Sequence, residues 1–297
     1  MTVPSEPLLA IDIGGTKVAF ARVSGELVTD RRQAPTPRSG GGDALVDLVA
    51  AQAKASGASA IAIAATGIVR DGTLTALNPA TLPIEDCYPL VRNIEISTGI
   101  APAVLNDAQA AAWGEFRFGA GRGQRCFLFM TASTGVGGGL VVDGDLLVGA
   151  QGLAGHIGHT SSAGTKALCG CGRRGCLETV ASGTAIAARY SDAIGSVVAA
   201  PDVFAAAAGG DRLADRFIDE AARALAEAFA DVTAAVDLDS VAIGGGVGLA
   251  KGFVERVRRH SDALPPAFRR PVKPATTGPD AGIIGVADYF VAKNFTK

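Results

Sequence analysis

The stretch LLAIDIGGTKVAFARV, residues 8–23, consists of an apolar run, a short glycine turn and a second apolar run. Short apolar runs bounded by turn residues are typical of buried strands, and a tight turn between them makes the second strand antiparallel to the first. Asp12 lies at the end of the first run, just before Gly14-Gly15-Thr16-Lys17. The stretch therefore predicts a β-hairpin with a carboxylate beside its turn.

A second copy of this arrangement occurs in the middle of the chain. The strand-like run 126–131 leads into the turn STGVGGG, residues 133–139, and residues 140–142 lead out of it. Asp143-Gly144 then predicts a hairpin turn into residues 145–148. Glycine hairpins are common singly, but two copies that each open a domain-sized segment indicate a duplicated architecture.

The rest of the chain has the pattern of an α/β protein. Apolar spacing predicts helices over 44–55, 108–116, 215–236 and 281–292, and strands over 60–65, 103–105 and 240–243. A chain of 297 residues favours two domains. We expect an N-terminal α/β domain over 1–118 and a C-terminal one over 119–297, with a working site in the cleft between them. The C-terminal helix, 281–293, can pack back on the first domain.

Composition excludes several functional classes. The 27 basic and 29 acidic residues give a net charge of −2 with no basic block, so we expect no nucleic-acid partner. No apolar run approaches the ~18 residues that a membrane span needs, and the first residues do not have the pattern of a secretory signal. These features predict a cytoplasmic protein that does not bind membranes.

The glycine turns indicate phosphate binding. Glycines let backbone N–H groups close on a phosphate, and the first turn adds the hydroxyl of Thr16 and the cation of Lys17 to Gly14 and Gly15. Asp12 is placed to hold a phosphate-bound Mg²⁺ through water. The second turn offers another cradle, through Thr134, Gly135, Gly137 and Gly138. Gly245 and Gly246 follow a buried strand, where they can admit an adenosine or simply form a strand-to-helix turn.

A cysteine-rich stretch predicts a metal site. His159, Cys169, Cys171 and Cys176 supply four nitrogen and sulfur ligands within eighteen positions, and glycines between the cysteines let the backbone fold tightly. A set of this kind without an open position fits structural Zn²⁺. Buried free thiols are the alternative.

These motifs resemble the ROK family of repressors, open reading frames and sugar kinases. The resemblance rests on residues 12–17, 105–108, 134–139 and 169–176, which occur in the order and spacing of the family over nearly the whole chain. It implies a two-domain α/β ATPase fold of the actin-like or hexokinase-like (ribonuclease H-like) kind with an inter-domain cleft. It further implies transfer of a phosphoryl group from ATP to a sugar, and a homodimer.

The resemblance also assigns roles to side chains. Asp107 matches the family's general base, and Asn106 would hold the sugar, although an Asn-Asp pair before a helix can equally be an N-cap. Asn78, His159 and Glu178 match sugar contacts of the family. Asn78 can instead set a turn before Pro79, and Glu178 can be a charge at a helix N-terminus.

His156 departs from the glucokinase pattern of the family, which has Glu at this place. The form His156-Ile157-Gly158-His159 is similar to N-acetylmannosamine kinases, and an imidazole in place of a carboxylate would change which C1 and C2 substituents are accepted. The resemblance thus implies phosphorylation of N-acetylmannosamine at C6, in amino sugar and sialic acid catabolism. A glucokinase, an N-acetylglucosamine kinase and a sugar-sensing regulator are the alternatives; a spare metal ligand is the other role for His156.

Overall fold

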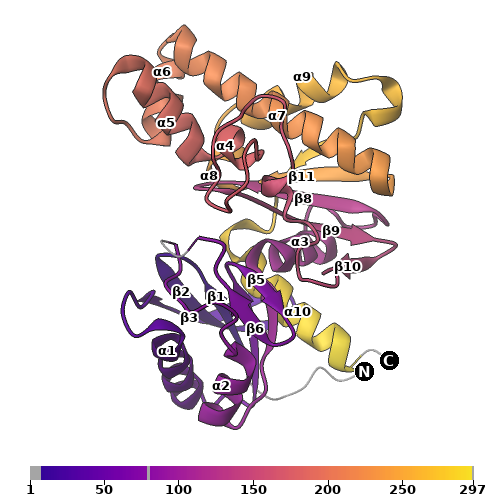
Figure 1. The fold of residues 1–297 in the computed structure, drawn as a ribbon. Coiled ribbons are helices and arrows are strands. Elements are labelled where there is room, and N and C mark those ends of the chain that lie inside the picture. Colours follow the sequence, from indigo (N-terminus) through magenta and orange to yellow (C-terminus); the bar gives the residue numbers. More distant parts are fainter. Residues whose placement is uncertain (1–7, 79–80, 296–297) are drawn as a thin grey trace. The chain divides into compact units, whose positions relative to one another are not determined.

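The structure is a computed structural model that describes residues 8–78 and 81–295. The chain forms two compact units, and each contains a five-stranded sheet. The first unit contains the residues up to Phe118, Val148–Ala154 and the residues from Thr277 onward (Figure 1). The second unit contains Gly119–Leu147 and Gly155–Thr276. The end of the chain therefore belongs to the same unit as its beginning.

The first sheet has the order β3-β2-β1-β4-β7, in which β1 pairs antiparallel with β2 and parallel with β4. Its strands are β1 (Leu8–Ile13), β2 (Lys17–Ser24), β3 (Leu27–Pro35), β4 (Ala60–Ala65) and β7 (Ala103–Asn106). A separate hairpin consists of β5 (Ile68–Arg70) and β6 (Thr73–Thr75). The helices are α1 (Gly41–Ser56), α2 (Leu90–Thr98), α3 (Asp107–Phe118) and α10 (Ala281–Phe295), which follows the 3₁₀ turn η3 (Gly278–Asp280).

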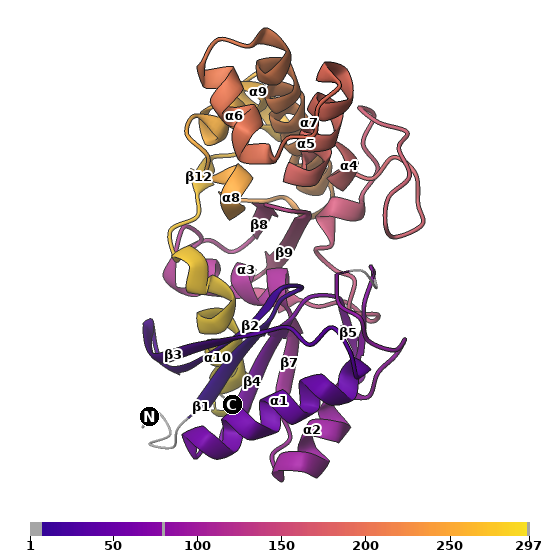
Figure 2. The same ribbon diagram turned by 90° about the vertical axis from the view of Figure 1, so that its left-hand side faces the viewer.

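The alternation of side chains along β1 decides which face each residue covers. Leu9, Ile11 and Ile13 pack with residues of α1 and α2 in one buried cluster, while Ala10 packs with Ile283 of α10. Helices α1 and α2 lie on one side of this sheet and α10 on the other (Figure 2). Successive side chains of a strand point to opposite faces. Asp12 is therefore on the α10 face, at the carboxyl end of β1.

Helices α3 and α10 pack unusually close together because both have a glycine where they cross. A Cβ at Gly285 would lie 1.8 Å from the carbonyl oxygen of Ala110, and a Cβ at Gly114 would lie 2.5 Å from that of Ala281. Neither distance leaves room for a side chain. This contact fixes the first turn of α3, which begins with Asp107, against the first turn of α10.

The second sheet repeats the order of the first, as β10-β9-β8-β11-β12. In both sheets the first two pairs of strands are antiparallel and the last two are parallel. Its strands are β8 (Phe127–Ala132), β9 (Val136–Val142), β10 (Asp145–Leu147), β11 (Ser240–Gly244) and β12 (Val272–Pro274). The α-helices are α4 (Glu178–Ala181), α5 (Gly183–Ile194), α6 (Ala200–Ala208), α7 (Arg212–Val236), α8 (Gly245–Gly248) and α9 (Phe253–Asp262). Two 3₁₀ turns, η1 (Ile157–His159) and η2 (Pro266–Phe268), complete the unit.

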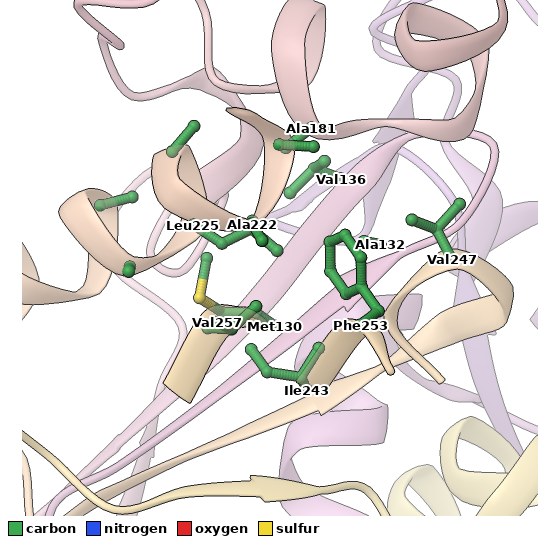
Figure 3. Packing of buried hydrophobic residues seen from close by; sticks show 14 of the residues in the cluster. Met130, Ala132, Val136, Ala181, Ala222, Leu225, Ile243, Val247, Phe253 and Val257 are labelled. Atoms are coloured by element: carbon green, nitrogen blue, oxygen red, sulfur yellow. The ribbon is translucent and has the colours of Figure 1, made fainter. Parts of the chain in front are cut away.

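The core of the second unit lies between this sheet and its helices. Met130 of β8 and Ile243 of β11 point toward Leu225 of α7, Phe253 and Val257 of α9 (Figure 3). Asp211 caps α7 by accepting hydrogen bonds from the N–H groups two and three residues later. The cap and the long apolar stripe of α7 explain why it is the longest helix among the described residues.

The two predicted hairpins are confirmed. Ile13 pairs with Val18 across the first turn, and Asp143 and Gly144, both at positive φ, connect β9 to β10. The extent of the second glycine turn is a correction, because β9 already begins at Val136 and only residues 133–135 form the turn. Among the described residues, no helix combines the length and apolar character that a membrane span needs.

Candidate functional site

Asp12 and Asp107 lie at the same edge of the first sheet. Asp12 is at the end of β1, Asp107 directly follows β7, and a Cβ on Gly282 would be 3.9 Å from Oδ2 of Asp12 and 3.8 Å from the carbonyl oxygen of Asp107. Burial, and next the charge of Asp107, raise the pKa of Asp12 from 3.8 to about 6, against the lowering effect of Lys17 and Arg31. Such a pair of carboxylates is suited to a cation or to proton transfer.

Asn106 caps α3 and thereby positions Asp107. Its Oδ1 accepts hydrogen bonds from the N–H groups of Ala108 (3.0 Å) and Gln109 (3.1 Å), and its Nδ2 donates to the carbonyl of Gly67 at 2.9 Å. Burial raises the pKa of the Asp107 carboxyl, although the hydrogen bond from the Ala108 N–H acts in the opposite direction. The N-cap alternative from the sequence therefore belongs to Asn106, and Asp107 is the first helical residue.

The first glycine turn is held through three consecutive carbonyls. The carbonyl of Gly14 accepts from the Thr36 hydroxyl (2.7 Å), that of Gly15 from the Arg38 guanidinium (2.5 Å), and that of Thr16 from the Thr36 N–H (3.1 Å). In a trans peptide the N–H points opposite to the C=O. The N–H groups of Gly15, Thr16 and Lys17 therefore point away from residues 36–38, in the manner of an anion-binding nest.

The second turn is held in a similar way by a helix. The carbonyl of Ser133 accepts from the Gly183 N–H at 2.7 Å, and that of Thr134 accepts from the Thr184 hydroxyl at 2.9 Å, both at the start of α5. The N–H groups of Thr134 and Gly135 consequently point away from α5. This second turn thus also presents N–H groups, and it is shorter than the sequence predicts.

The other glycines expected at a nucleotide have different surroundings. Gly137 and Gly138 lie within β9, paired with Thr131 and Met130 of β8, and a Cβ at Gly138 would meet the Phe129 carbonyl at 2.7 Å. Gly245 begins α8 with φ +83°, directly after β11. A Cβ at Gly246 would meet no described atom within 4 Å, so its exposed backbone can be approached by a ligand.

His159, Cys169, Cys171 and Cys176 come together in the second unit. Their ligand atoms all lie within 4.8 Å of one another, with 3.6 Å between His159 Nδ1 and Cys169 Sγ and 3.7 Å between the Sγ atoms of Cys171 and Cys176. Metal–ligand bonds of about 2.3 Å to sulfur and 2.0–2.1 Å to nitrogen place the corners of a tetrahedron roughly 3.6–3.8 Å apart. The donor set and its spacing therefore fit a tetrahedral zinc ion.

Glu178 connects this metal cluster to the second glycine turn. Its Oε1 accepts from the Cys169 thiol at 3.7 Å, and its Oε2 accepts from the Val136 N–H at 3.1 Å. His156 stacks on His159 with ring centroids 6.5 Å apart. Because His159 directs Nδ1 to the cluster, only its Nε2 is left for a substrate. The predicted sugar contacts of this unit are thus neighbours of the metal ligands.

Asn78 belongs to a loop of the first unit. Its carbonyl accepts from the N–H groups of Thr81 (2.9 Å) and Leu82 (3.3 Å), and its side chain is exposed. The sequence also offers the alternative that Asn78 sets a turn before Pro79, which lies outside the described residues. These hydrogen bonds join the backbone of Asn78 to that of Thr81 and Leu82.

Three residues at the site were not found by sequence reasoning. Thr36 and Arg38 hold the first turn from 22 and 23 residues away, and no local pattern marks them. Gln109 is almost fully buried on α3, and its Nε2 donates to the Ala154 carbonyl at 2.8 Å. A polar amide among the alanines at 108–112 is the one signal that the sequence offered, and it lies two positions after Asp107.

Comparisons with known proteins identify the family of the chain. Residues 8–293 match the ROK family. The N-acetylmannosamine kinase of Citrobacter koseri is 45% identical over 282 residues, which cover 94% of this chain and 97% of that protein.

Two solved structures have the same fold. The ROK hexokinase of Thermus thermophilus superposes with a TM-score of 0.84 at 31% identity and covers 97% of this chain and 99% of its own. A ROK family glucokinase of Streptomyces griseus, solved with glucose and AMPPNP, superposes with a TM-score of 0.79 at 31% identity, covering 95% and 98%. The predicted α/β fold of the hexokinase-like kind is confirmed, and the chain belongs to the ROK family.

Proposed function

We propose that this protein transfers the γ-phosphoryl group of ATP to the C6 hydroxyl of N-acetylmannosamine. The observation that carries the sugar assignment is the 45% identity to a kinase of that name over nearly the full length of both chains. The kinase chemistry is supported by the two carboxylates at the end of β1 and the start of α3.

Asp107 is the general base of the proposed reaction. Its carboxylate takes the proton of the C6 hydroxyl, the freed oxygen attacks the γ-phosphorus, and the bond from that phosphorus to the bridging oxygen breaks to release ADP. A raised pKa makes Asp107 a better proton acceptor than an ordinary aspartate. Asn106 fixes the base by capping α3, its side chain also hydrogen-bonds the Asp107 carboxyl, and we assign its amide to the sugar as well.

The residues of the first turn bind the nucleotide phosphates. The N–H groups of Gly15 and Thr16 and the cation of Lys17 receive the negative charge, and Thr134 and Gly135 do the same in the second unit. Asp12 holds Mg²⁺ through water, and the ion when bound neutralises phosphate charge during transfer. Gly245 and the exposed Gly246 accommodate the adenosine; Gly137 and Gly138 support this site from within β9.

His159, Cys169, Cys171 and Cys176 hold a structural Zn²⁺. These four side chains would supply all the ligands of a tetrahedral ion, so a bound Zn²⁺ would order the loop and would leave no position for a catalytic water. This loop leads directly into α4, whose first residue is Glu178, and it begins at His159, on which His156 stacks. We assign His156, Glu178 and the Nε2 of His159 to the sugar, together with Asn78 of the first unit.

A sugar panel tests the proposal. The purified protein with ATP and Mg²⁺ is assayed for ADP release with N-acetylmannosamine, N-acetylglucosamine, glucose and mannose. We expect kcat/KM for N-acetylmannosamine to be at least about tenfold above the others, because a polar group that meets an unmatched partner costs more than about 1.4 kcal/mol. Phosphorus and proton NMR of the product locate the phosphate on O6. A preference for glucose would refute the sugar assignment.

The variant His156→Glu sharpens this test, because it restores the residue of the glucokinase pattern. We expect it to lose activity on N-acetylmannosamine and to gain on glucose. His156→Gln, which keeps a neutral hydrogen-bonding group, is the control and should retain the wild-type preference. We also propose that the protein is a homodimer, which sedimentation of the wild-type sample tests. We propose a cytoplasmic location, because the reaction needs ATP.

A further inference from the structure

We propose that Arg38 is a positioning residue that couples the first glycine turn to the loop of Asn78, so that sugar and nucleotide each strengthen binding of the other. This inference rests on the proposed function, in which the turn binds phosphate and Asn78 contacts the sugar. It concerns contacts within the first unit alone.

Arg38 contacts both segments at once. Its Nη2 donates to the carbonyl of Gly15 at 2.5 Å, and its Nη1 donates to the carbonyl of Thr81 at 3.2 Å. These two carbonyls are 66 positions apart in the chain. The planar guanidinium can satisfy both at a fixed geometry, which an ammonium on a flexible stem cannot.

The two segments also touch each other directly. A Cβ at Gly15 would lie 2.5 Å from Cγ2 of Thr81 and 3.0 Å from its carbonyl oxygen. Gly15 therefore has no room for a side chain, and the turn and Thr81 are packed directly against each other. This steric contact is independent of the hydrogen bonds of Arg38 and leads to the same conclusion.

Thr81 transmits the contact to Asn78. The N–H of Thr81 donates to the Asn78 carbonyl at 2.9 Å, and that of Leu82 to the same oxygen at 3.3 Å. Leu82 is almost fully buried in the core of the unit, which anchors one of these two donors. Through the hydrogen bond between them, a displacement of Thr81 is felt at the backbone of Asn78.

A second residue holds the glycine turn without contacting the loop. Thr36 is buried and binds the carbonyls of Gly14 and Thr16, so the turn keeps its shape when Arg38 is removed. Arg38 itself is exposed, as are its hydrogen bonds to Gly15 and Thr81. Removal of Arg38 should therefore disturb the link between the two segments more than either segment alone.

The test measures the coupling itself. The Kd of a non-hydrolysable ATP analogue with Mg²⁺ is determined by calorimetry with and without saturating N-acetylmannosamine, and the ratio of the two values is the coupling. Allosteric couplings of this kind are typically about 5- to 150-fold. In Arg38→Ala we expect the ratio to fall at least about fivefold, toward one, while the Kd without sugar changes less. Arg38→Lys should behave like Arg38→Ala because one ammonium cannot bridge both carbonyls.

Arg22→Ala is the matched control. Arg22 also donates across the fold to a carbonyl, that of Ser56 at 2.6 Å, but it contacts neither the turn nor the loop. Its coupling ratio should equal that of the wild type, and thermal denaturation should show both variants folded. Gly15→Ala, which introduces the steric conflict with Thr81, gives a second way to lose the coupling.

Two results would overturn the inference. A wild-type ratio near one would show that no coupling exists, and an unchanged ratio in Arg38→Ala would show that Arg38 does not carry it. Neither result bears on whether N-acetylmannosamine is phosphorylated. If the sugar panel instead identifies another acceptor, the proposed substrate is wrong, and the same ratio is measured with that acceptor.

Discussion

The two glycine turns of this molecule share one frame but differ in what holds them. Both connect the first two strands of a five-stranded sheet, and both have consecutive carbonyls bonded on one side so that N–H groups point to the other. In the first unit, side chains of Thr36 and Arg38 hold the turn. In the second unit, residues at the N-terminus of α5 hold it.

The strand before each turn differs as well. Asp12 pairs with Ala19 and Ala64, and Thr131 occupies the corresponding place in the second sheet, paired with Gly137 and Gly244. The second turn is instead connected through Glu178 to the cysteine cluster. A duplicated frame thus presents backbone N–H groups twice, and the residues added around each copy differ.

The largest effect that this comparison predicts is at Asp107, the general base that we propose in the first unit. Asp107→Asn keeps the shape of the side chain but cannot accept the proton, so turnover should fall by about 10²–10⁴-fold. Sugar binding, measured by calorimetry, should change little. Near-normal turnover would remove Asp107 from the role of base and leave the first unit without its assigned chemistry.

The next effect is at Asp12. Asp12→Asn should lower kcat/KM for Mg²⁺–ATP by about 10²-fold, because one preorganised charge at the phosphates is lost. Thr131→Val, at the corresponding position of the second sheet, should stay within about threefold in the same assay. Equal losses in the two variants would mean that the two turns do not divide the chemistry as proposed.

Asp12→Asn should raise the free energy of unfolding although it lowers activity. Because burial and Asp107 raise the folded-state pKa of Asp12 to about 6, the ionised carboxylate disfavours the folded state once the pH rises above the usual value of 3.8. Without Mg²⁺, the variant should therefore be more stable than the wild type at pH 8, by an amount of the order of 3 kcal/mol, and this gain should shrink as the pH falls from 6 to 4. Urea unfolding at pH 8 and at pH 4 measures this gain in the free energy of unfolding. A gain that does not change with pH would contradict the raised pKa of Asp12.

The smallest effect on activity concerns the cysteine cluster of the second unit. Cys171→Ser should reduce bound zinc, measured by elemental analysis, from about one ion per chain to a small fraction, because the serine hydroxyl is a poor zinc ligand. We expect the Tm to fall by roughly 5–10 °C, as for a loss of about 3 kcal/mol in a chain of this size. The KM for the sugar should rise more than the KM for ATP.

Cys126→Ser is the control for that variant, because Cys126 is in the same unit but outside the cluster. It should keep its zinc and its KM values. Loss of zinc without any change in sugar KM would separate the cluster from the sugar contacts and limit its role to stability.

Local features were predictable from the sequence. The turn at Gly14 and the set of His159 and three cysteines depend on residues close together in the chain, so their spacing is visible without a structure. The extent of the second turn was not predictable, because the glycines at 137–139 favour a turn by their own propensity, whereas pairing with β8 makes them part of a strand. Gly138 is required there by its close approach to Phe129 and Ile157.

The groups that hold the site could not be predicted. Arg38 and Thr36 reach the first turn only because β3 brings them there, and β3 itself is a largely exposed strand with no clear apolar alternation. Gln109 and Ala154 are 45 residues apart. Contacts of this separation depend on the completed fold, and a single sequence carries no sign of them.

The position of α10 also affects the order in which the molecule is completed on the ribosome. One buried cluster of the first unit cannot form until α10 has been synthesised, because Ile283 and Ala287 of that helix pack on Ala10, Ala19 and Ala21. At about 5–20 residues per second, roughly 9–36 s separate the synthesis of Phe118 from that of the last residue. The second unit has all its residues once Thr276 has emerged. The half that is translated first is therefore the half that is finished last.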